Sequence, residues 1–394
     1  MINIIDKSQC CGCNACVQIC PKQCISMKED EQGFMYPEVD CSICINCGRC
    51  DKVCPIINRN KKKEPLKVLA IKNINENQRV NSSSGGIFIL LAEKIIEQNG
   101  VVFGARFDTR WEVEHCYAET IEQLEPLMGS KYVQSRIGHT YKTAEQFLKQ
   151  GRKVMFVGSS CQISGLRNFL KRDYENLIAV DFVCHGTPSP GVWREYLKEI
   201  MPLSSVSGIN FREKRMHGFG WKKYGFVVRG KSHLKDATDK VLLSETYYEN
   251  IFMRGFISNL YLRPSCYNCT SKNGASGSDL TIADFWGIQK IHPYFDDDKG
   301  VSAVFIHTDK GKRIIDKLSS NADIVESNIS EATALNPSYY KAVSIPSKYS
   351  YFWKTFKKTK SVIASVDIST RSTFVGRIKA IIGFYIRKYL SLKK

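Results

Sequence analysis

The first 54 residues contain a repeated cysteine pattern that leaves few choices of fold. Two runs share the spacing C-x2-C-x2-C-x3-C, each followed by proline, and counterparts lie 34 residues apart. The first run is Cys10, Cys13, Cys16 and Cys20 with Pro21; the second is Cys44, Cys47, Cys50 and Cys54 with Pro55. Two copies of one motif predict a pseudo-twofold α+β domain of ferredoxin type over residues 1–60, with one 4Fe-4S cluster per half.

The spacing also predicts which thiolates share a cluster. Three cysteines on one tight loop reach three irons of a single cubane, while the fourth, before proline, leaves the loop and binds the other cluster. One cluster is therefore assigned to Cys10, Cys13, Cys16 and Cys54, and the other to Cys44, Cys47, Cys50 and Cys20. Zinc is the alternative, but it takes four ligands, usually as two C-x2-C pairs, and fits eight cysteines in two such runs less well. Cys11, Cys24 and Cys41 have no counterpart in the repeat and are predicted not to be ligands.

Composition limits the remaining choices. The chain has 394 residues, of which 43% are hydrophobic and 24% charged, as expected for a soluble protein of two or three domains. Neither a secretory signal nor a run of about 18 apolar residues is visible, so we expect a cytoplasmic protein whose cysteines bind metal rather than form disulfides. The net charge of +18 suits an acidic electron carrier, a nucleic acid, an anionic membrane or an anionic cofactor, or it serves only solubility. No nucleic-acid-binding motif is visible, so nucleic acid is not expected as a partner.

A basic linker at 61–65 separates this domain from a body with alternating strand and helix patterns. Strands are predicted at 68–72, 153–158 and 177–184, a hairpin at 101–119, and helices at 87–100 and 140–150. This alternation predicts an α/β body. Its parts are expected at 66–150 and 151–340, followed by a tail at 341–394.

Four further cysteines are predicted to meet in the body. Cys161 and Cys184 each follow a buried strand, and parallel strands present their carboxyl ends at one edge of a sheet. Cys266 and Cys269 form a C-x2-C pair in a loop. We hypothesise that the four bind a third 4Fe-4S cluster; the alternatives are buried free thiols, a zinc site or a redox-active dithiol. Cys116, inside a predicted strand, is expected to serve packing.

Other segments carry weaker signals. Ser84, Gly85 and Gly86 precede a predicted helix, where free N–H groups suit a phosphate or merely cap the helix. The segment 211–221 mixes basic, aromatic and glycine residues, as a loop over an anionic ligand would. From Arg371 onward, apolar residues recur at helical spacing among basic ones. Such a helix either lies on an anionic membrane surface, making the protein peripheral to it, or packs on its own protein.

The order of these motifs resembles the coenzyme F-420 hydrogenase/dehydrogenase beta-subunit family, and more narrowly the ferredoxin-fused bacterial members associated with polysaccharide biosynthesis. The resemblance runs from about residue 4 to about residue 340. The motifs after the ferredoxin domain are Ser84-Gly85-Gly86, Gly129-Ser130-Lys131-Tyr132, Gly158-Ser159-Ser160-Cys161-Gln162, Cys184-His185-Gly186, Cys266-x2-Cys269 and Asp279 to Gly287. The family usually has Gly-Thr-Pro-Cys where this chain has Gly158-Ser159-Ser160-Cys161.

The resemblance implies an α/β body that binds FAD through residues 84–86 and 129–132, and a series of electron carriers that includes clusters and flavin. It implies an oxidoreductase acting between a ferredoxin-type carrier or hydride donor and an organic acceptor. The alternative is a non-catalytic electron-transfer subunit serving a partner enzyme. His185 and Lys131 are the candidate catalytic residues, with His217 and Trp221 as further candidates. No deazaflavin site is assigned, because no residue pattern indicates one.

Overall fold

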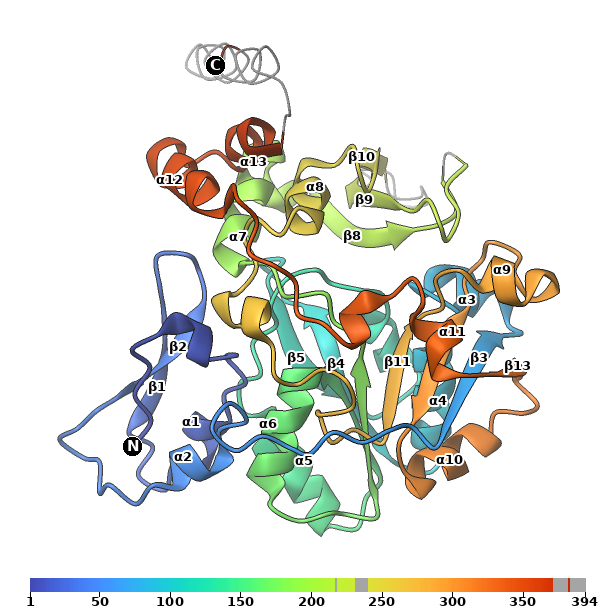
Figure 1. The fold of residues 1–394 in the computed structure, drawn as a ribbon, viewed down its shortest axis with the longest axis horizontal. Coiled ribbons are helices and arrows are strands. Elements are labelled where there is room, and N and C mark those ends of the chain that lie inside the picture. The colour runs from blue at the N-terminus through green and yellow to red at the C-terminus, as the bar shows by residue number, and fades with distance from the viewer. Residues whose placement is uncertain (217, 231–239, 371–381, 383–394) are drawn as a thin grey trace.

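The computed structural model describes residues 1–216, 218–230, 240–370 and 382. It consists of a small N-terminal domain beside a larger mixed α/β body, with a third layer of structure above the body (Figure 1). His217 and, apart from Ile382, the predicted amphipathic helix from Arg371 lie outside the described residues. None of the described helices has the length and apolar character needed to cross a membrane.

The N-terminal domain is built from two short helices and one hairpin. Its helices are α1 (Ala15–Ile19) and α2 (Arg49–Val53), and its strands are β1 (Ile25–Glu29) and β2 (Met35–Val39), which pair antiparallel. The predicted twofold repeat is visible in the backbone. Asn14 and Gly48 precede α1 and α2 with φ of 63° and 67°, and Cys20 and Cys54 end them with ψ of 116° and 118°.

The body is organised around an eight-stranded sheet with the order β13-β3-β12-β11-β7-β6-β4-β5. Its four central strands, β11, β7, β6 and β4, run parallel, and the strands outside them pair antiparallel. The strands are β3 (Lys67–Asn73), β4 (Val101–Phe107), β5 (Val113–Ala118), β6 (Val154–Ser159), β7 (Leu177–Phe182), β11 (Leu280–Asp284), β12 (Ser302–Ile306) and β13 (Ala322–Ser327). The α/β body expected from the alternating pattern is therefore confirmed.

Successive side chains of each strand point to opposite faces of the sheet, and both faces are apolar, so helices cover both. Val102 and Met155 pack with α4 and α10 on one face, while Phe103 and Phe156 pack with α5 and α6 on the other. The helices of the body are α3 (Glu76–Asn81), α4 (Ile87–Ile96), α5 (Thr140–Lys149), α6 (Ser160–Leu170), α9 (Ile288–Ile291), α10 (Asp309–Asp316) and α11 (Ile329–Thr333). The N-terminal domain lies against the α5–α6 side, where α1 and α2 contact α6.

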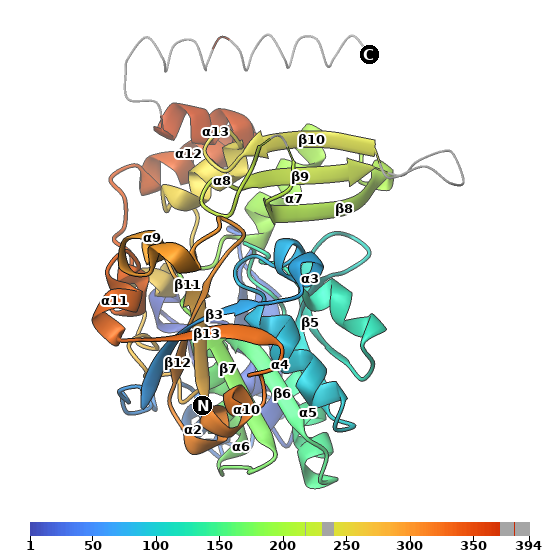
Figure 2. The ribbon, with the colours of Figure 1, turned by 90° about the vertical axis from the view of Figure 1, so that its right-hand side faces the viewer.

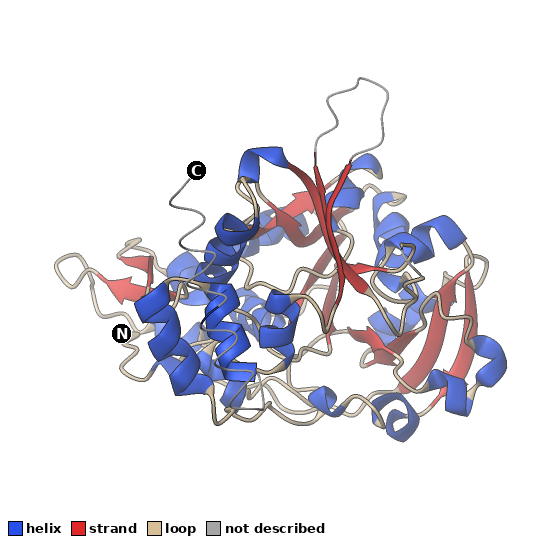
Figure 3. Cartoon of the chain, turned by 90° about the horizontal axis from the view of Figure 1, so that it is seen from above, coloured by secondary structure: helices blue, strands red, loops and turns tan. Residues whose placement is uncertain are grey.

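A separate three-stranded antiparallel sheet, ordered β10-β9-β8, lies above the carboxyl edge of the parallel strands (Figure 2). Figure 3, which views the molecule from above, shows helices gathered beside this sheet. Trp193, Phe211, Phe226, Phe252 and Phe352 form its aromatic core. The strands of this upper layer and the helices beside them are α7 (Pro190–Ile200), β8 (Val206–Glu213), β9 (Gly225–Gly230), β10 (Lys240–Thr246), α8 (Ile251–Ile257), α12 (Tyr349–Thr359) and α13 (Val362–Thr370).

Candidate iron–sulfur and cofactor site

The structure brings the eight cysteines of the N-terminal repeat together in two sets. Each set lines its own pocket, with an open volume of about 350 Å³ in either case. The inner set, beside the body, consists of Cys10, Cys13, Cys16 and Cys54. The outer set, which includes the exposed Cys47, consists of Cys20, Cys44, Cys47 and Cys50. Each pocket thus receives three thiols from one run and the last thiol of the other, the crossed grouping predicted from the spacing.

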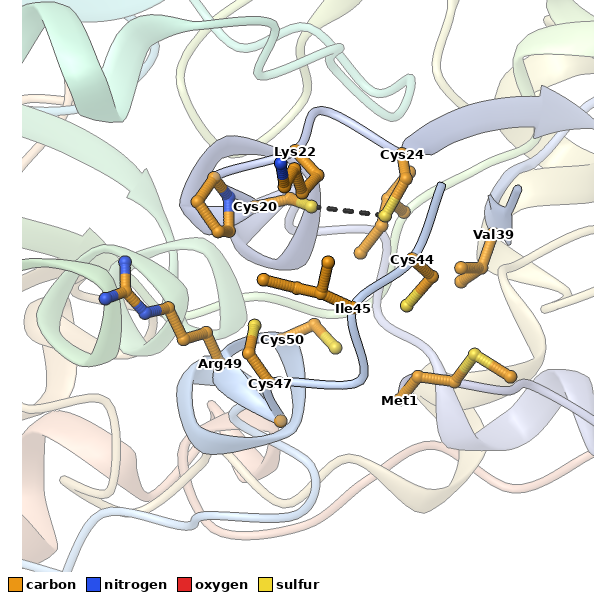
Figure 4. Close-up of a pocket in the computed structure, with 13 residues that line it drawn as sticks. Met1, Cys20, Lys22, Cys24, Val39, Cys44, Ile45, Cys47, Arg49 and Cys50 are labelled. Atoms are coloured by element: carbon orange, nitrogen blue, oxygen red, sulfur yellow. Dashed lines mark hydrogen bonds between the residues drawn. The ribbon is translucent and has the colours of Figure 1, made fainter. Parts of the chain in front are cut away.

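The outer pocket is open to solvent. Figure 4 shows thiols of the outer set around one space, with Met1, Val39 and Ile45 completing the wall. Cys47 and Ile45 are exposed. Cys24 also lines this pocket, and its sulfur lies 3.4 Å from that of Cys20. Cys24 is buried and lies closer to the candidate ligands than its absence from the repeat indicated.

The inner pocket is shielded by the body. Gly165 of α6 approaches Cys13 so closely that a Cβ on it would lie 2.9 Å from the Cys13 sulfur. Burial, together with the nearby charges of Cys10 and Cys54, raises the pKa of Cys16 to about 12. Several thiolates can therefore coexist here only if a cation compensates them, as iron does when it binds deprotonated cysteine. In the described part of the chain, no three His, Cys, Asp or Glu side chains are placed to bind a single metal ion. The four thiols of the inner set line a larger pocket instead.

The four cysteines of the body also come together, and we call them the body set. Cys161 lies in the first turn of α6, Cys184 follows β7, Cys266 lies in the 3-10 helix Pro264–Asn268, and Cys269 ends that helix. Their thiols interact electrostatically with one another. Burial raises the pKa of Cys269 to about 11, with the Cys161 thiolate adding to the rise.

Cys11 links the inner set to the body set. Its buried thiol interacts with those of Cys13 and Cys161, one from each set. Sequence reasoning missed this position, because the repeat marks Cys11 only as an unmatched residue. The three cysteine sets therefore follow one another in space, in the order outer, inner and body.

The two segments expected to contact a flavin lie side by side. Ser83 Oγ accepts a hydrogen bond from Ser130 N at 2.7 Å, so the loop before α4 touches the Gly129–Tyr132 segment. Gly86 precedes α4 with φ of 84°, and no side chain caps the helix. Gly86 is the N-cap residue of this helix, as the alternative prediction had it, but it supplies no side-chain acceptor, so the first N–H groups of the helix are available to an anion.

Lys131 and His185 both have environments that favour their neutral forms. Burial lowers the pKa of Lys131 to about 7, and its Nζ donates to the carbonyl oxygens of Met128 (2.7 Å) and Gly129 (3.2 Å). Burial also lowers the pKa of His185, opposed by a hydrogen bond to Asn259 at 2.6 Å. Lys131 could therefore exchange a proton near neutral pH.

Aromatic contacts join His185 to the predicted flavin segment. Phe256 stacks on Tyr132 with ring centroids 4.9 Å apart and meets the His185 ring edge-on at 5.3 Å. Since His185 directly follows Cys184, the body set and the Gly129–Tyr132 segment lie close to each other. Trp221 stacks on Trp286 at 4.9 Å and donates to Asp284.

Arg212 is a site residue that sequence reasoning missed, although its segment at 211–221 was noted for basic and aromatic residues. Its side chain is 3% exposed, and Nη1 donates to Asp284 at 2.5 Å and lies 3.5 Å from the Tyr132 hydroxyl. Its Nε and Nη2 are buried and have no hydrogen-bond partner among the described residues. Buried donors of this kind are rare and indicate an acceptor absent from the chain itself. Together with the uncapped helix, Arg212 fits an anionic cofactor such as FAD.

Comparisons with known proteins match two parts of the chain. Residues 9–56 match the model of a 4Fe-4S dicluster domain. Residues 151–332 match the model for the C-terminal region of the coenzyme F420 hydrogenase/dehydrogenase beta subunit. A search of curated proteins gives no match. Among solved structures, a chain of the xenon-derivatised F420-reducing NiFe hydrogenase complex from Methanosarcina barkeri aligns with a TM-score of 0.46 and 16% identity, covering 76% of this chain and 94% of that one.

Proposed function

We propose that this chain is an iron–sulfur flavoprotein oxidoreductase of the coenzyme F420 hydrogenase/dehydrogenase beta-subunit family. Residues 151–332 match the C-terminal model of that family, and a 4Fe-4S dicluster domain lies in front of them. The chain passes electrons between a ferredoxin-type carrier or hydride donor and an organic acceptor. Oxidoreductase chemistry and two 4Fe-4S clusters agree with the matched families; FAD, the third cluster and the acceptor belong to the proposal. The narrower likeness to members associated with polysaccharide biosynthesis stays a prediction.

The observation that carries the proposal is the sequence of cysteine sets in space. The inner and outer sets hold one cluster each, and the body set holds the third. Cys11, in contact with Cys13 and Cys161, joins the inner set to the body set. The sets therefore lead from the solvent-facing Cys47 toward His185 and Tyr132, where an organic cofactor would lie.

The residues around that cofactor have separate tasks. A bound flavin exchanges one electron with a cluster and two with a hydride donor or organic acceptor. The free N–H groups at the start of α4 would hold its phosphates, and Arg212 would donate to it through Nε and Nη2. Lys214 fixes the loop before α4, because its Nζ donates to Ser84 O at 3.0 Å and Arg79 O at 2.7 Å. His185 and Lys131 hold or release the proton that accompanies reduction.

The proposal is tested by anaerobic purification with iron, sulfide and flavin quantified per chain. Three four-iron clusters give twelve irons, and we expect these with one FAD. Eight irons without flavin would leave the alternative, an electron-transfer subunit that serves a partner enzyme. Zinc in place of iron, or no cubane signal by electron paramagnetic resonance (EPR) after reduction, would refute the redox assignment.

A matched pair of variants tests the flavin contact. Arg212→Gln should weaken FAD retention at least tenfold, because a buried hydrogen bond to a charged group contributes about 1.5–3 kcal/mol. Arg110→Gln, which changes an exposed arginine, should leave the flavin content unchanged. Equal FAD content in both variants would exclude Arg212 from the flavin site.

A further inference from the structure

Arg263 is a buried cation at the junction between the N-terminal domain and the body. The residue is 1% exposed and precedes the 3-10 helix that carries Cys266. Its Nε donates to Cys10 O at 2.6 Å, and its Nη2 donates to Met35 O at 2.9 Å and to the Cys10 sulfur at 3.5 Å. One side chain of the body thus grips the N-terminal domain at a candidate cluster ligand.

The guanidinium is fixed in this position by its surroundings. Nη1 donates to Gln134 Oε1 at 2.8 Å, and the group lies over the ring of Tyr36 at 4.3 Å. A Cβ on Gly12, which has φ of +70°, would lie 2.8 Å from Nη1. The side chain therefore has little freedom to turn away from Cys10.

No carboxylate among the described residues forms an ion pair with Arg263; its hydrogen-bond partners are carbonyl oxygens, an amide and a thiol. A buried charge without a counter-ion is costly, since water does not solvate it. The nearest negative charge available to Arg263 is the thiolate of Cys10 with the cluster it would bind. The guanidinium charge thus acts on the inner cluster through a medium of low dielectric constant.

The outer set has no equivalent of this buried cation among the described residues, although Cys44 is the counterpart of Cys10 in the repeat. Lys22 and Arg49 line the outer pocket but are exposed, and the Arg49 side chain extends away from the thiols (Figure 4). The Met1 ammonium is also exposed and pairs with Asp51 at 3.1 Å. Water and salt screen such charges strongly. A neutral donor also reaches this set, the Ile2 N–H at 3.3 Å from the Cys50 sulfur.

We propose that Arg263 raises the reduction potential of the inner cluster above that of the outer cluster, so that electrons collect next to the body set. This inference rests on the proposed function, because it requires that both sets hold clusters. Reduction adds one electron to the cluster and makes its net charge more negative by one, which a fixed positive charge stabilises. The hydrogen bond to the Cys10 sulfur acts in the same direction, because donors to ligand sulfurs stabilise the reduced state.

The body set should respond to the same charge, but less. Arg263 O accepts from Cys266 N at 2.8 Å, so the two residues share one turn. However, the hydrogen bonds of the guanidinium point toward Cys10 rather than toward Cys266. We therefore expect the effect of Arg263 to be largest on the inner cluster, smaller on the body cluster and negligible on the outer cluster.

The test is an anaerobic redox titration of the full chain monitored by EPR, with the inner cluster identified by the altered signal of a Cys16→Ser variant. Arg263→Gln should shift the one-electron equilibrium of the inner cluster at least tenfold toward the oxidised form, about 59 mV. Arg263→Lys keeps the positive charge, so the potential of its inner cluster should stay close to the wild-type value. Arg49→Gln is the matched control and should move no cluster by that much. If the inner and outer potentials of Arg263→Gln keep their wild-type separation, the inference is wrong.

A second measurement needs no variant of Arg263 and decides the matter if Arg263→Gln does not fold. The wild-type titration is repeated between about 0.05 M and about 0.5 M salt, where exposed charges become screened and buried ones do not. The inner cluster should have the higher potential and the smaller salt dependence. Two clusters of equal potential, or a higher potential at the outer cluster, would overturn the inference while leaving the proposed function intact. Only an absence of clusters would refute both.

Discussion

Replacing Gly165 with alanine should loosen the N-terminal domain from the body, although the same change usually strengthens a helix. Gly165 lies within α6, where alanine is favoured over glycine by about 1 kcal/mol. Here, however, the new Cβ would lie 2.9 Å from both Cβ and Sγ of Cys13 and 3.2 Å from the Tyr141 hydroxyl. Cys13 cannot yield easily, because its sulfur is a candidate ligand of the inner cluster.

The two effects can be compared in magnitude. Overpacking of a filled contact costs about 1–3 kcal/mol. Since α6 is helical in both the docked and the opened form, the helical gain does not change the docking equilibrium, and Gly165→Ala should weaken the docking of the N-terminal domain by about 1–3 kcal/mol. Gly165→Val should weaken it more, because valine adds two further methyl groups to the contact.

Hydrogen exchange measured by mass spectrometry reports this loosening directly. The amide of Tyr141 donates across the junction to Gln18 at 3.0 Å, so its protection depends on docking. A loss of about 2 kcal/mol raises the population of the opened form by a factor of about 30. Gly208→Ala is the control, because the closest neighbour of its new Cβ lies at 3.8 Å. If Tyr141 exchanges as slowly in Gly165→Ala as in the wild type, the close contact does not limit docking and the reasoning fails.

Three further predictions test other parts of the molecule. Cys20→Ala should abolish the EPR signal of the outer cluster and keep that of the inner one, whereas Cys54→Ala should do the reverse. If Cys20→Ala instead lost the inner cluster and Cys54→Ala the outer one, the crossed ligation would be refuted. Asp279→Asn should lower stability by about 3–5 kcal/mol, measured as a fall in the thermal midpoint, because its fully buried carboxylate pairs with an arginine at 2.7 Å. Asp173→Asn removes a 71% exposed partner of that arginine and should cost under about 1 kcal/mol, so equal losses would contradict the role of burial. Lys131→Met should be more stable than the wild type at and below pH 7, because the fold disfavours the ammonium and lowers its pKa to about 7; the difference in thermal midpoint should shrink as the pH rises toward about 10, and a difference that grew with pH would refute the assignment.

The parts of the fold and site that the sequence predicts are those set by local chemistry. The spacing of the two cysteine runs is enough to group Cys20 with Cys44 and Cys54 with Cys10, because the loop itself decides which thiols can share a pocket. The apolar runs that became β6 and β7 are equally local signals, since buried parallel strands have continuous hydrophobic stretches.

The parts that the sequence does not predict depend on contacts between distant segments. Arg263 meets Cys10 across 253 positions of the chain, and Arg212 meets Asp284 across 72. Neither arginine stands in a pattern that distinguishes it from the other basic residues of a strongly positive chain. Cys11 is similar, because only the docking of α1 on α6 brings its thiol to Cys161.

The attachment of the N-terminal domain to α6 has a kinetic consequence. With Gly165 against Cys13, the proposed transfer between the inner set and the body set would take place within one molecule, and its rate would not depend on protein concentration. Only the encounter of an external carrier with the exposed rim at Cys47 is a collision between two molecules. Dilution or added salt should therefore slow the entry of electrons at that rim and leave their onward passage unchanged.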